Sequence, residues 1–330
     1  MRNRIARRLT ELWYSNEAPP GLLRAASSLY GRAVRGRLGR PSPRPPCPVI
    51  VVGNIVAGGS GKTPVVAALA ASLGKAGHAV SIISRGYGGR SGVRPVRVEP
   101  GSTAAEVGDE ALELHSVTGR PVWVCRKRDA ALAAALADGA QVVLSDDGLQ
   151  HRALARSFEI CVVDARRGLG NGFLLPAGPL RQSADRLETV DMVLVKHVRC
   201  PTGAGGAVPG VAFELETGEI EPVRGDARPP RPPASIDALA GIADPEAFFE
   251  VLEQRGFRLR RHPLADHQPI AADMLAELAG PVVMTVKDSM RLPRPAIDRP
   301  REDLFVLPVR ARLPEQVLQS VADHVREFRS

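Results

Sequence analysis

The segment Val49–Thr63, with the sequence VIVVGNIVAGGSGKT, decides the fold class of this chain. Its first four residues, Val49–Val52, are all apolar, which is typical of a strand buried on both faces. The alanine-rich stretch that follows predicts a helix over residues 62–76. Glycines between a strand and a helix let successive backbone N–H groups point at phosphate oxygens. The segment therefore predicts a phosphate-binding loop (P-loop) that holds a nucleotide.

The predicted loop supplies the groups that a nucleoside triphosphate requires. Lys62 can neutralise the β- and γ-phosphates, the Thr63 hydroxyl can bind Mg²⁺, and a helix N-terminus favours an anion. The strict P-loop pattern has a glycine five residues before Gly61, where this chain has Val56, so the match is a variant. We expect a continuous run of nucleotide-binding residues: Val56, Ala57, Gly58, Gly59, Ser60, Gly61, Lys62 and Thr63.

A carboxylate partner for the metal follows the strand that is expected over residues 141–144. Asp146 and Asp147 come just after this apolar run, and a P-loop needs an acidic residue at the end of a neighbouring strand. The alternative is that the two residues only open a turn before Gly148. We expect Asp146 and Asp147 to be metal ligands together with Thr63, with ATP and Mg²⁺ as cofactors.

Apolar strands and helices alternate along most of the chain, which favours an α/β fold with a mostly parallel sheet flanked by helices. The 330 residues suggest more than one domain. We expect an N-terminal helical segment (1–40), a P-loop core (41–200), a Pro/Gly-rich linker (201–234) and a smaller α/β domain (235–330). The linker should contain a hairpin over residues 211–223 that turns at Thr217 and Gly218. Further strands are expected over residues 79–84, 121–125, 159–163, 192–195, 235–240 and 281–285, and helices over 106–118, 129–137, 245–254, 271–278 and after Pro314.

Positive charge is concentrated at the N-terminus. The net charge is +8, and residues 1–40 alone carry nine arginines against two glutamates. Ile5, Leu9, Leu12 and Trp13 share one helical face, as in a basic amphipathic helix that lies on an anionic membrane surface with Trp13 and Tyr14 among the headgroups. A basic helix packed on its own domain has the same pattern, so both interpretations stay open. Because only 4% of the residues are aromatic and no recognition motif accompanies the arginines, nucleic acid is not expected as a partner.

Composition excludes several other classes. Hydrophobic residues make up 44% and charged residues 24%, which are ordinary globular values and exclude a disordered or fibrous chain. The apolar runs are shorter than the ~18 to 20 residues of a membrane-spanning helix, and no signal peptide is recognisable. The cysteines have no CxxC spacing. We expect buried thiols, with no disulfide or zinc site, at Cys47, Cys125, Cys161 and Cys200.

Further motifs resemble, in order, those of the tetraacyldisaccharide 4'-kinase family, the lipid A 4'-kinases. They are VGNI (52–55), GGSGKTP (58–64), SRGYGG (84–89), VGDE (107–110), SDDGLQH (145–151), LPAGPLR (175–181) and AGI (240–242), and they span nearly the whole chain. The resemblance implies an ATP-dependent kinase that phosphorylates the 4'-hydroxyl of tetraacyldisaccharide 1-phosphate in lipid A (lipopolysaccharide) biosynthesis. It further implies a peripheral protein on the anionic cytoplasmic face of the inner membrane, and we predict no obligate protein partner.

The resemblance also implies roles for individual residues. Asp109, which by pattern alone is favoured as a helix N-cap, matches a general base that acts with a histidine of the second domain. His267 is the candidate for that histidine, and Lys62 would stabilise the transferred phosphoryl group. If Asp109 and His267 come from different domains, catalysis requires the domains to close. Glu110 would lie near the metal, and four residues are expected to hold the disaccharide headgroup: Arg85, Tyr87, His151 and Arg181.

The chain departs from the family pattern at three places, one of which is the segment 126–128 (RKR), more basic than is usual. Val286 stands where the family usually has glutamate, which argues against a polar role there, and Gln268 stands where a second histidine is common. The competing class is a membrane-associated P-loop ATPase switch of the partition type. Those proteins carry a lysine immediately before the paired glycines, and this chain has Ala57 at that position.

Overall fold

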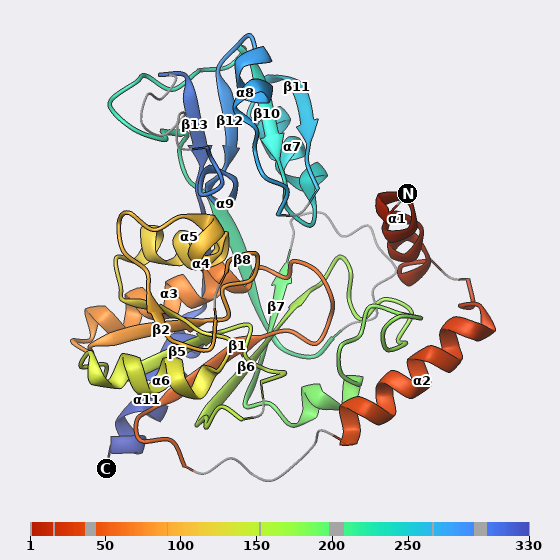
Figure 1. Ribbon diagram of the computed structural model, residues 1–330, viewed down its shortest axis with the longest axis vertical. Coiled ribbons are helices and arrows are strands. Elements are labelled where there is room, and N and C mark those ends of the chain that lie inside the picture. The colour runs from red at the N-terminus through yellow and green to blue at the C-terminus, as the bar shows by residue number, and fades with distance from the viewer. Residues whose placement is uncertain are drawn as a thin grey trace. The chain divides into compact units, whose positions relative to one another are not determined.

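The structure is a computed structural model that describes residues 2–15, 17–36, 44–90, 92–151, 153–197, 208–265, 267–293 and 302–329. The chain forms two compact units, whose elements are labelled in Figure 1. Unit 1 comprises Met1–Ser84, Arg128–Leu215 and Ala311–Ser330, and unit 2 comprises Arg85–Lys127 and Glu216–Arg310. The units therefore differ from the consecutive segments expected from composition, because the chain enters unit 2 twice.

Unit 1 is built on parallel strands that neighbour one another in the order β8-β7-β6-β1-β5-β2. Strand β1 lies between β5 and β6 and is buried along its whole length, which explains its continuous apolar sequence. The expected mostly parallel α/β fold is therefore confirmed. The bounds are β1 Val49–Gly53, β2 Val80–Ser84, β5 Val142–Asp146, β6 Phe158–Asp164, β7 Met192–His197 and β8 Val211–Thr217.

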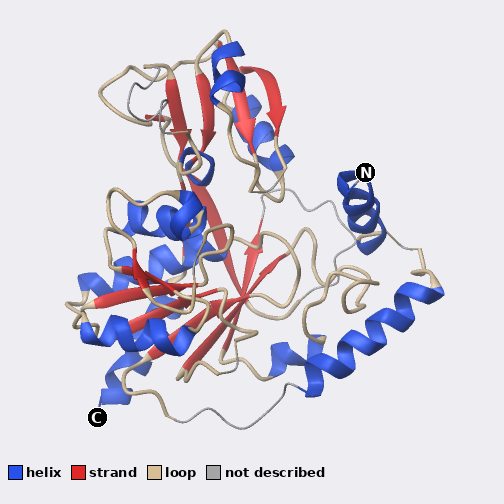
Figure 2. Ribbon diagram, viewed as in Figure 1, coloured by secondary structure: helices blue, strands red, loops and turns tan. Residues whose placement is uncertain are grey.

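Figure 2 shows the helices of unit 1 in blue beside its strands in red. Besides the two N-terminal helices, they are α3 (Lys62–Lys75), α6 (Arg128–Ala137), the short 3-10 helix η1 (Ala184–Glu188) and α11 (Glu315–Arg329). The apolar residues of α3 that form the core are Val65, Val66, Leu69, Ala70 and Leu73. The sequence assigned α11 to the C-terminal domain, but it belongs to unit 1, where His324 Nε2 lies 2.9 Å from Ser157 Oγ. An amphipathic pattern predicts a helix without specifying which core it joins.

The N-terminal helices α1 (Arg2–Trp13) and α2 (Gly21–Gly36) are anchored on unit 1 by hydrogen bonds. Trp13 Nε1 donates to Pro176 O (3.0 Å), Ser27 Oγ to Leu174 O (2.8 Å) and Tyr30 OH to Arg181 O (3.2 Å). The Trp13 indole thus contacts the protein itself. No helix in the described parts of the chain has the length and apolar character needed to cross a bilayer.

Unit 2 contains a sheet with the strand order β11-β10-β12-β13-β9, parallel except for the pair formed by β9 and β13. Phe248, Phe249 and Leu252 of α7 pack on Ile236 and other residues of this sheet. Residues 85–127 add an antiparallel pair of strands and two helices. The bounds are β3 Val96–Arg97, α4 Ala104–Val107, α5 Asp109–Thr118, β4 Val122–Val124, β9 Glu221–Pro222, β10 Ser235–Ala240, α7 Pro245–Gln254, β11 Arg258–Pro263, α8 Ala272–Glu277, β12 Val282–Thr285, α9 Val286–Ser289 and β13 Leu304–Leu307, with β14 (Val309–Arg312) where the chain returns to unit 1.

The structure corrects two local predictions. The hairpin over residues 211–223 is wrong, because β8 pairs in parallel with β7 and β9 pairs with β13. At the position of the expected turn, the Gly218 N–H instead donates a hydrogen bond to Pro308 O (2.9 Å). The single helix predicted over residues 106–118 is interrupted at Gly108, whose φ of 87° ends α4 and starts α5 in a new direction.

Two observations complete the comparison with the expected elements. The arginine-rich strand β11 was not predicted, because RLRRHP lacks an apolar pattern; its Arg261 instead pairs with Glu246 and Glu253. Three of the cysteines are buried as expected, namely Cys47, Cys125 and Cys161, and Cys200 lies outside the described residues.

Candidate active site

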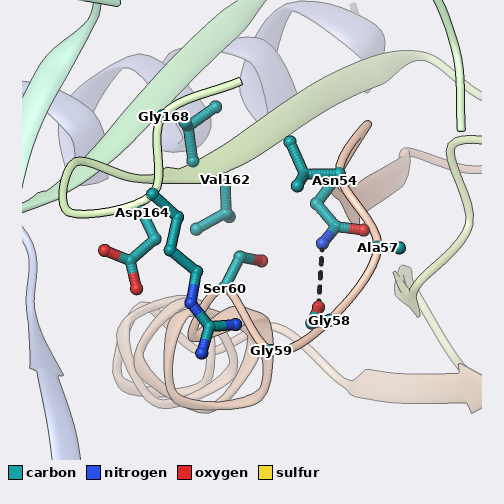
Figure 3. Close-up of a pocket in the computed structure, with 11 residues that line it drawn as sticks. Asn54, Ala57, Gly58, Gly59, Ser60, Val162, Asp164 and Gly168 are labelled. Atoms are coloured by element: carbon teal, nitrogen blue, oxygen red, sulfur yellow. Dashed lines mark hydrogen bonds between the residues drawn. The ribbon is translucent and has the colours of Figure 1, made fainter. Parts of the chain in front are cut away.

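The P-loop of unit 1 follows β1 and ends at the first turn of α3. Gly61 caps this helix with a φ of 85°, a left-handed conformation that side chains other than glycine rarely adopt. Asn54 Nδ2 donates to Gly58 O (3.2 Å) and so fixes the beginning of the loop (Figure 3). The glycines that marked the motif in the sequence thus shape a loop that opens onto a helix N-terminus.

Buried polar atoms of this loop lack protein partners. Asn54 Oδ1 and Ser60 Oγ are both inaccessible to solvent and accept or donate no hydrogen bond among the described residues. They line a pocket together with Asp164 and Arg167, and Figure 3 shows Ser60 and Asp164 on its wall. Because buried polar groups are nearly always hydrogen-bonded, these two atoms are exceptions at the P-loop.

Asp147 is held between two cations. Lys62 Nζ lies 3.5 Å from its Oδ1, and Arg181 Nη1 lies 3.0 Å from its Oδ2. Burial raises the pKa of Asp147, but the charges of Lys62 and Arg181 outweigh it, so the pKa lies below its usual value. The structure therefore places Asp147, expected as a metal ligand, in ion pairs with Lys62 and Arg181.

Arg181 reaches this position because its loop is hydrogen-bonded to the P-loop. Its backbone N–H donates to Ile55 O (2.7 Å), and Ala57 N–H donates to Pro179 O (2.8 Å). The sequence assigned Arg181 to the disaccharide headgroup, and in the structure its guanidinium contacts Asp147, which also pairs with Lys62. Arg181 therefore lies beside the P-loop of unit 1.

Asp146 is the last residue of β5 and is buried, in register with Val52 at the end of β1. Thr63, in the first turn of α3, supplies a hydroxyl. In the described residues, no three His, Cys, Asp or Glu side chains are grouped so as to hold a metal. A hydroxyl and a carboxylate fit Mg²⁺, which is usually bound through one or two protein oxygens together with substrate phosphates.

The second group of predicted residues lies in unit 2. Asp109 opens α5 after Gly108, where a Cβ would lie only 2.5 Å from Tyr87 O. The N-cap is Gly108, so the N-cap interpretation that the pattern alone favoured for Asp109 does not hold, although Asp109 Oδ1 accepts the Glu110 N–H (2.9 Å). His267 Nδ1 lies 3.0 Å from Asp109 Oδ1 and 2.9 Å from Oδ2.

The contact between Asp109 and His267 corrects the expectation that the two residues come from different domains. Both belong to unit 2, because this unit contains residues 85–127 as well as 216–310. Burial raises the pKa of Asp109, but the hydrogen bond from His267 and the charges of Lys287 and Arg291 outweigh it and lower the pKa below its usual value. Asp109 is therefore ionised at neutral pH and can accept a proton.

Two cations that the sequence did not single out surround this pair. Arg291 Nε lies 3.6 Å from Asp109 Oδ2. Lys287 Nζ lies 3.2 Å from Glu110 Oε1 and 3.5 Å from His267 Nε2. The Glu110 carboxylate, expected near the metal, is thus paired with a lysine of its own unit.

The sequence model of the family described as tetraacyldisaccharide-1-P 4'-kinase matches residues 20–326. The chain belongs to this family. It is 46% identical over 307 residues to the tetraacyldisaccharide 4'-kinase of Alkalilimnicola ehrlichii, covering 88% of each chain. In fold, it resembles the crystal structure of LpxK from Aquifex aeolicus in complex with ATP, with a TM-score of 0.72, 23% identity, and coverage of 91% of this chain and 97% of that one.

Membership of the tetraacyldisaccharide 4'-kinase family confirms the function predicted from the sequence motifs. The chain is an ATP-dependent phosphotransferase of lipid A biosynthesis, and the partition-type ATPase switch is not favoured. The roles of individual residues remain predictions that the geometry can only support.

The remaining predicted residues of the 4'-kinase lie in both units. Tyr87 is 60% exposed, and its ring centroid is 4.9 Å from that of His267 in unit 2. Arg85, at the start of the same segment, is exposed. His151 lies in unit 1, just past the turn formed by Asp147, where its N–H donates to Gly148 O (2.9 Å).

The sequence missed Lys287 and Arg291 because neither residue stands in a recognisable local pattern. Their segment could be found only through the family resemblance, which marks Val286, the residue next to Lys287. The lysine next to that valine is the residue that contacts Glu110 and His267.

Proposed function

We propose that this chain transfers the γ-phosphoryl group of ATP to the 4'-hydroxyl of tetraacyldisaccharide 1-phosphate, with Asp109 as the general base. The observation that carries the proposal is the hydrogen bond between His267 Nδ1 and the Asp109 carboxylate. A buried, ionised carboxylate oriented by an imidazole is suited to accept a hydroxyl proton. The family membership supplies the acceptor, because a 4'-kinase must activate a sugar hydroxyl.

The phosphoryl transfer forms one P–O bond, breaks another and moves one proton. The 4'-hydroxyl oxygen forms a bond to the γ-phosphorus, and its proton moves to the Asp109 carboxylate. The bond between the γ-phosphorus and the β,γ-bridging oxygen breaks, and its electron pair leaves with ADP. Charge spreads over the equatorial oxygens of the transferred group in the transition state. Positioning and charge stabilisation therefore supply most of the rate acceleration.

The P-loop residues of unit 1 are proposed to hold the triphosphate. The Lys62 ammonium and the backbone N–H groups of the glycine-rich loop would contact the β- and γ-phosphates. Arg181 would add a planar guanidinium, which is suited to two parallel hydrogen bonds to a phosphate. Both cations contact Asp147, so this carboxylate keeps them oriented toward the loop.

Mg²⁺ is the proposed metal, which Thr63 and Asp146 would hold, with Asp147 as a further candidate. When bound, the ion would neutralise charge on the β- and γ-phosphates. Asp146 is better suited than Asp147 to bind the metal directly, because Lys62 and Arg181 already neutralise the charge of the Asp147 carboxylate. Glu110 is not included, since Lys287 neutralises its carboxylate.

The headgroup of the acceptor is proposed to contact Arg85, Tyr87 and His151. Tyr87 supports this assignment most directly, because its exposed ring lies against the imidazole that contacts the base. A tyrosine can stack on or hydrogen-bond to a sugar, and an arginine can bind the 1-phosphate.

We further propose that α2 contacts the cytoplasmic surface of the inner membrane, where ATP is available. Ser27 and Tyr30 attach α2 to the protein, while Leu22 is 88% and Leu29 is 63% exposed. These leucines are seven residues apart and so lie on one side of the helix. Exposed arginines at positions 24 and 32 accompany them, which suits an anionic lipid surface.

The activity is tested by incubating the full chain with ATP, Mg²⁺ and tetraacyldisaccharide 1-phosphate in mixed micelles, followed by mass spectrometry of the lipid. We expect one added phosphate, placed at the 4' position by fragmentation, and one ADP for each lipid converted. ATP hydrolysis without a phosphorylated lipid would overturn the assignment.

The membrane contact is tested by flotation with vesicles that contain phosphatidylglycerol or only phosphatidylcholine. The double variant Leu22→Ser, Leu29→Ser should lose most binding to the anionic vesicles. Val93→Ser is the matched control, because Val93 is 61% exposed in unit 2. Equal flotation of both variants would show that α2 is not the contact.

A further inference from the structure

We propose that Lys287 is a positioning residue that determines which ring nitrogen of the His267 imidazole carries the hydrogen. Its ammonium nitrogen lies 3.5 Å from His267 Nε2, while the other ring nitrogen, Nδ1, lies 2.9 Å from Asp109 Oδ2. The imidazole is thus placed between a donor and an acceptor. This inference rests on the proposed role of Asp109 as the base and extends it to a residue of a different segment.

The chemistry of the two neighbours selects one tautomer of the ring. A lysine ammonium has three N–H donors and no acceptor, so the ring nitrogen that faces it must present its lone pair. The hydrogen of the neutral imidazole then sits on Nδ1, where it is donated to the Asp109 carboxylate. With the opposite tautomer, the lone pair of Nδ1 would face the negative carboxylate, and an N–H on Nε2 would face the ammonium.

The local structure holds Lys287 firmly in this place. Lys287 belongs to the single turn α9, which follows strand β12 and is capped by the Thr285 side chain. The next residue, Asp288, is completely buried and accepts hydrogen bonds from Gly241 N (3.1 Å) and Thr285 Oγ1 (2.6 Å). Asp288 also pairs with Arg291. The backbone on both sides of Lys287 is therefore fixed by buried hydrogen bonds.

Two further contacts hold the partners of Lys287. Glu110 Oε1 lies 3.2 Å from the ammonium and directs it toward the ring. Arg291 Nη1 donates to Gln268 O (2.7 Å), which fixes the residue next to His267. His267 itself has a φ of 59°, an uncommon conformation that such contacts stabilise. The second acidic residue of the VGDE motif thus acts on the lysine, and through it on the imidazole.

The tautomer is measured by NMR of ¹⁵N-histidine-labelled protein without ligands at about pH 8, where unperturbed imidazoles are neutral. The chain has seven histidines, so the His267→Gln variant identifies the His267 signals. We expect the shift pattern of an Nδ1–H imidazole in the unmodified chain. Lys287→Met should give a mixture of tautomers, and Lys287→Arg should restore the original pattern, because arginine is also only a donor. Lys127→Met, which removes an exposed lysine of unit 2, should change nothing.

The same variants are then assayed as kinases. Lys287→Met should lower kcat by about 10- to 100-fold, the usual effect of losing a residue that orients a functional side chain, with little change in the KM for the lipid. Lys287→Arg should recover most of this loss. Glu110→Gln, which leaves the lysine in place but releases its ammonium, should act in the same direction and gives a second variant if Lys287→Met does not fold.

Two results would overturn the proposal. The first is an Nδ1–H imidazole in Lys287→Met that matches the unmodified chain. The second is a rise in the KM for the lipid with an unchanged kcat, which would make Lys287 a lipid-binding residue. The failure of the base assignment is recognised separately, because full activity of Asp109→Asn would remove Asp109 from the mechanism without altering the tautomer measured in the unmodified chain.

Discussion

Each unit of the molecule carries a pair of consecutive acidic residues beside a lysine, and the two pairs differ in what surrounds them. In unit 1, Asp147 contacts Lys62 and Arg181 at the P-loop. In unit 2, Asp109 contacts His267 while Glu110 contacts Lys287. The charged partners of the first pair are a lysine and an arginine, whereas the second pair also contacts an imidazole.

The two acidic pairs have different neighbours because phosphate binding and proton transfer need different partners for a carboxylate. Permanent cations beside a carboxylate stabilise phosphate charge and keep the carboxylate ionised, as required for a nucleotide site. An imidazole can hold a hydrogen in one of two positions, so it can orient a base toward a hydroxyl. ATP binding and proton transfer should therefore be separable by mutation.

The largest effect is expected for Asp109→Asn. It removes the proposed base and keeps the shape of the side chain, so kcat should fall by a factor of about 10² to 10⁴. The Kd for ATP, measured by calorimetry, should stay unchanged, because unit 1 holds the predicted nucleotide site. Asp226→Asn, an exposed change in the same unit, is the control. Retained turnover in Asp109→Asn would leave the proton acceptor unassigned.

The converse change is Lys62→Met, which removes the ammonium from the P-loop. We expect kcat/KM for ATP to fall by about 10²- to 10³-fold, as for the loss of one preorganised group that stabilises transition-state charge. The Kd for ATP should rise as well. Lys75→Met changes an exposed lysine at the other end of α3 and should have little effect on either quantity. An unchanged Kd for ATP would place the phosphates elsewhere.

The third prediction concerns stability in unit 2. Asp288→Asn should lower the free energy of unfolding by about 3 kcal/mol, because it leaves Arg291 without its buried partner. Urea unfolding followed by circular dichroism measures the change, and Asp273→Asn is an exposed control. A difference of less than about 1 kcal/mol between the two variants would mean that water or Asp109 compensates Arg291.

The smallest effect is a shift in pH dependence. The His267 hydrogen bond helps to hold the pKa of Asp109 below its usual value, so His267→Ala should raise that pKa. A carboxyl with a lowered pKa contributes stability at neutral pH that is lost as the pH falls through this pKa. The acid limb of kcat/KM and the acid unfolding midpoint should both move to higher pH in the variant. His324→Ala in unit 1 should leave the acid limb of kcat/KM in place.

The P-loop was predictable because its information is local. The apolar strand Val49–Val52, the glycines and Lys62 lie in one continuous segment, and each has a fixed place in a turn between a strand and a helix. The partners of Asp109 were accessible only through the resemblance to the 4'-kinases, because His267 lies 158 residues away in sequence. No local pattern marked Lys287 or Arg291.

The sequence by itself determined the P-loop, most of the strands and helices, and the kinase family, because these depend on short-range periodicity and on ordered motifs. The tertiary structure alone decided that Asp109 and His267 share a unit, that Arg181 contacts Asp147, and that Lys287 lies against the imidazole. The physical reason is that ion pairs and hydrogen bonds act over a few ångströms in space, whereas residues far apart in the chain come this close only in the folded unit to which they belong.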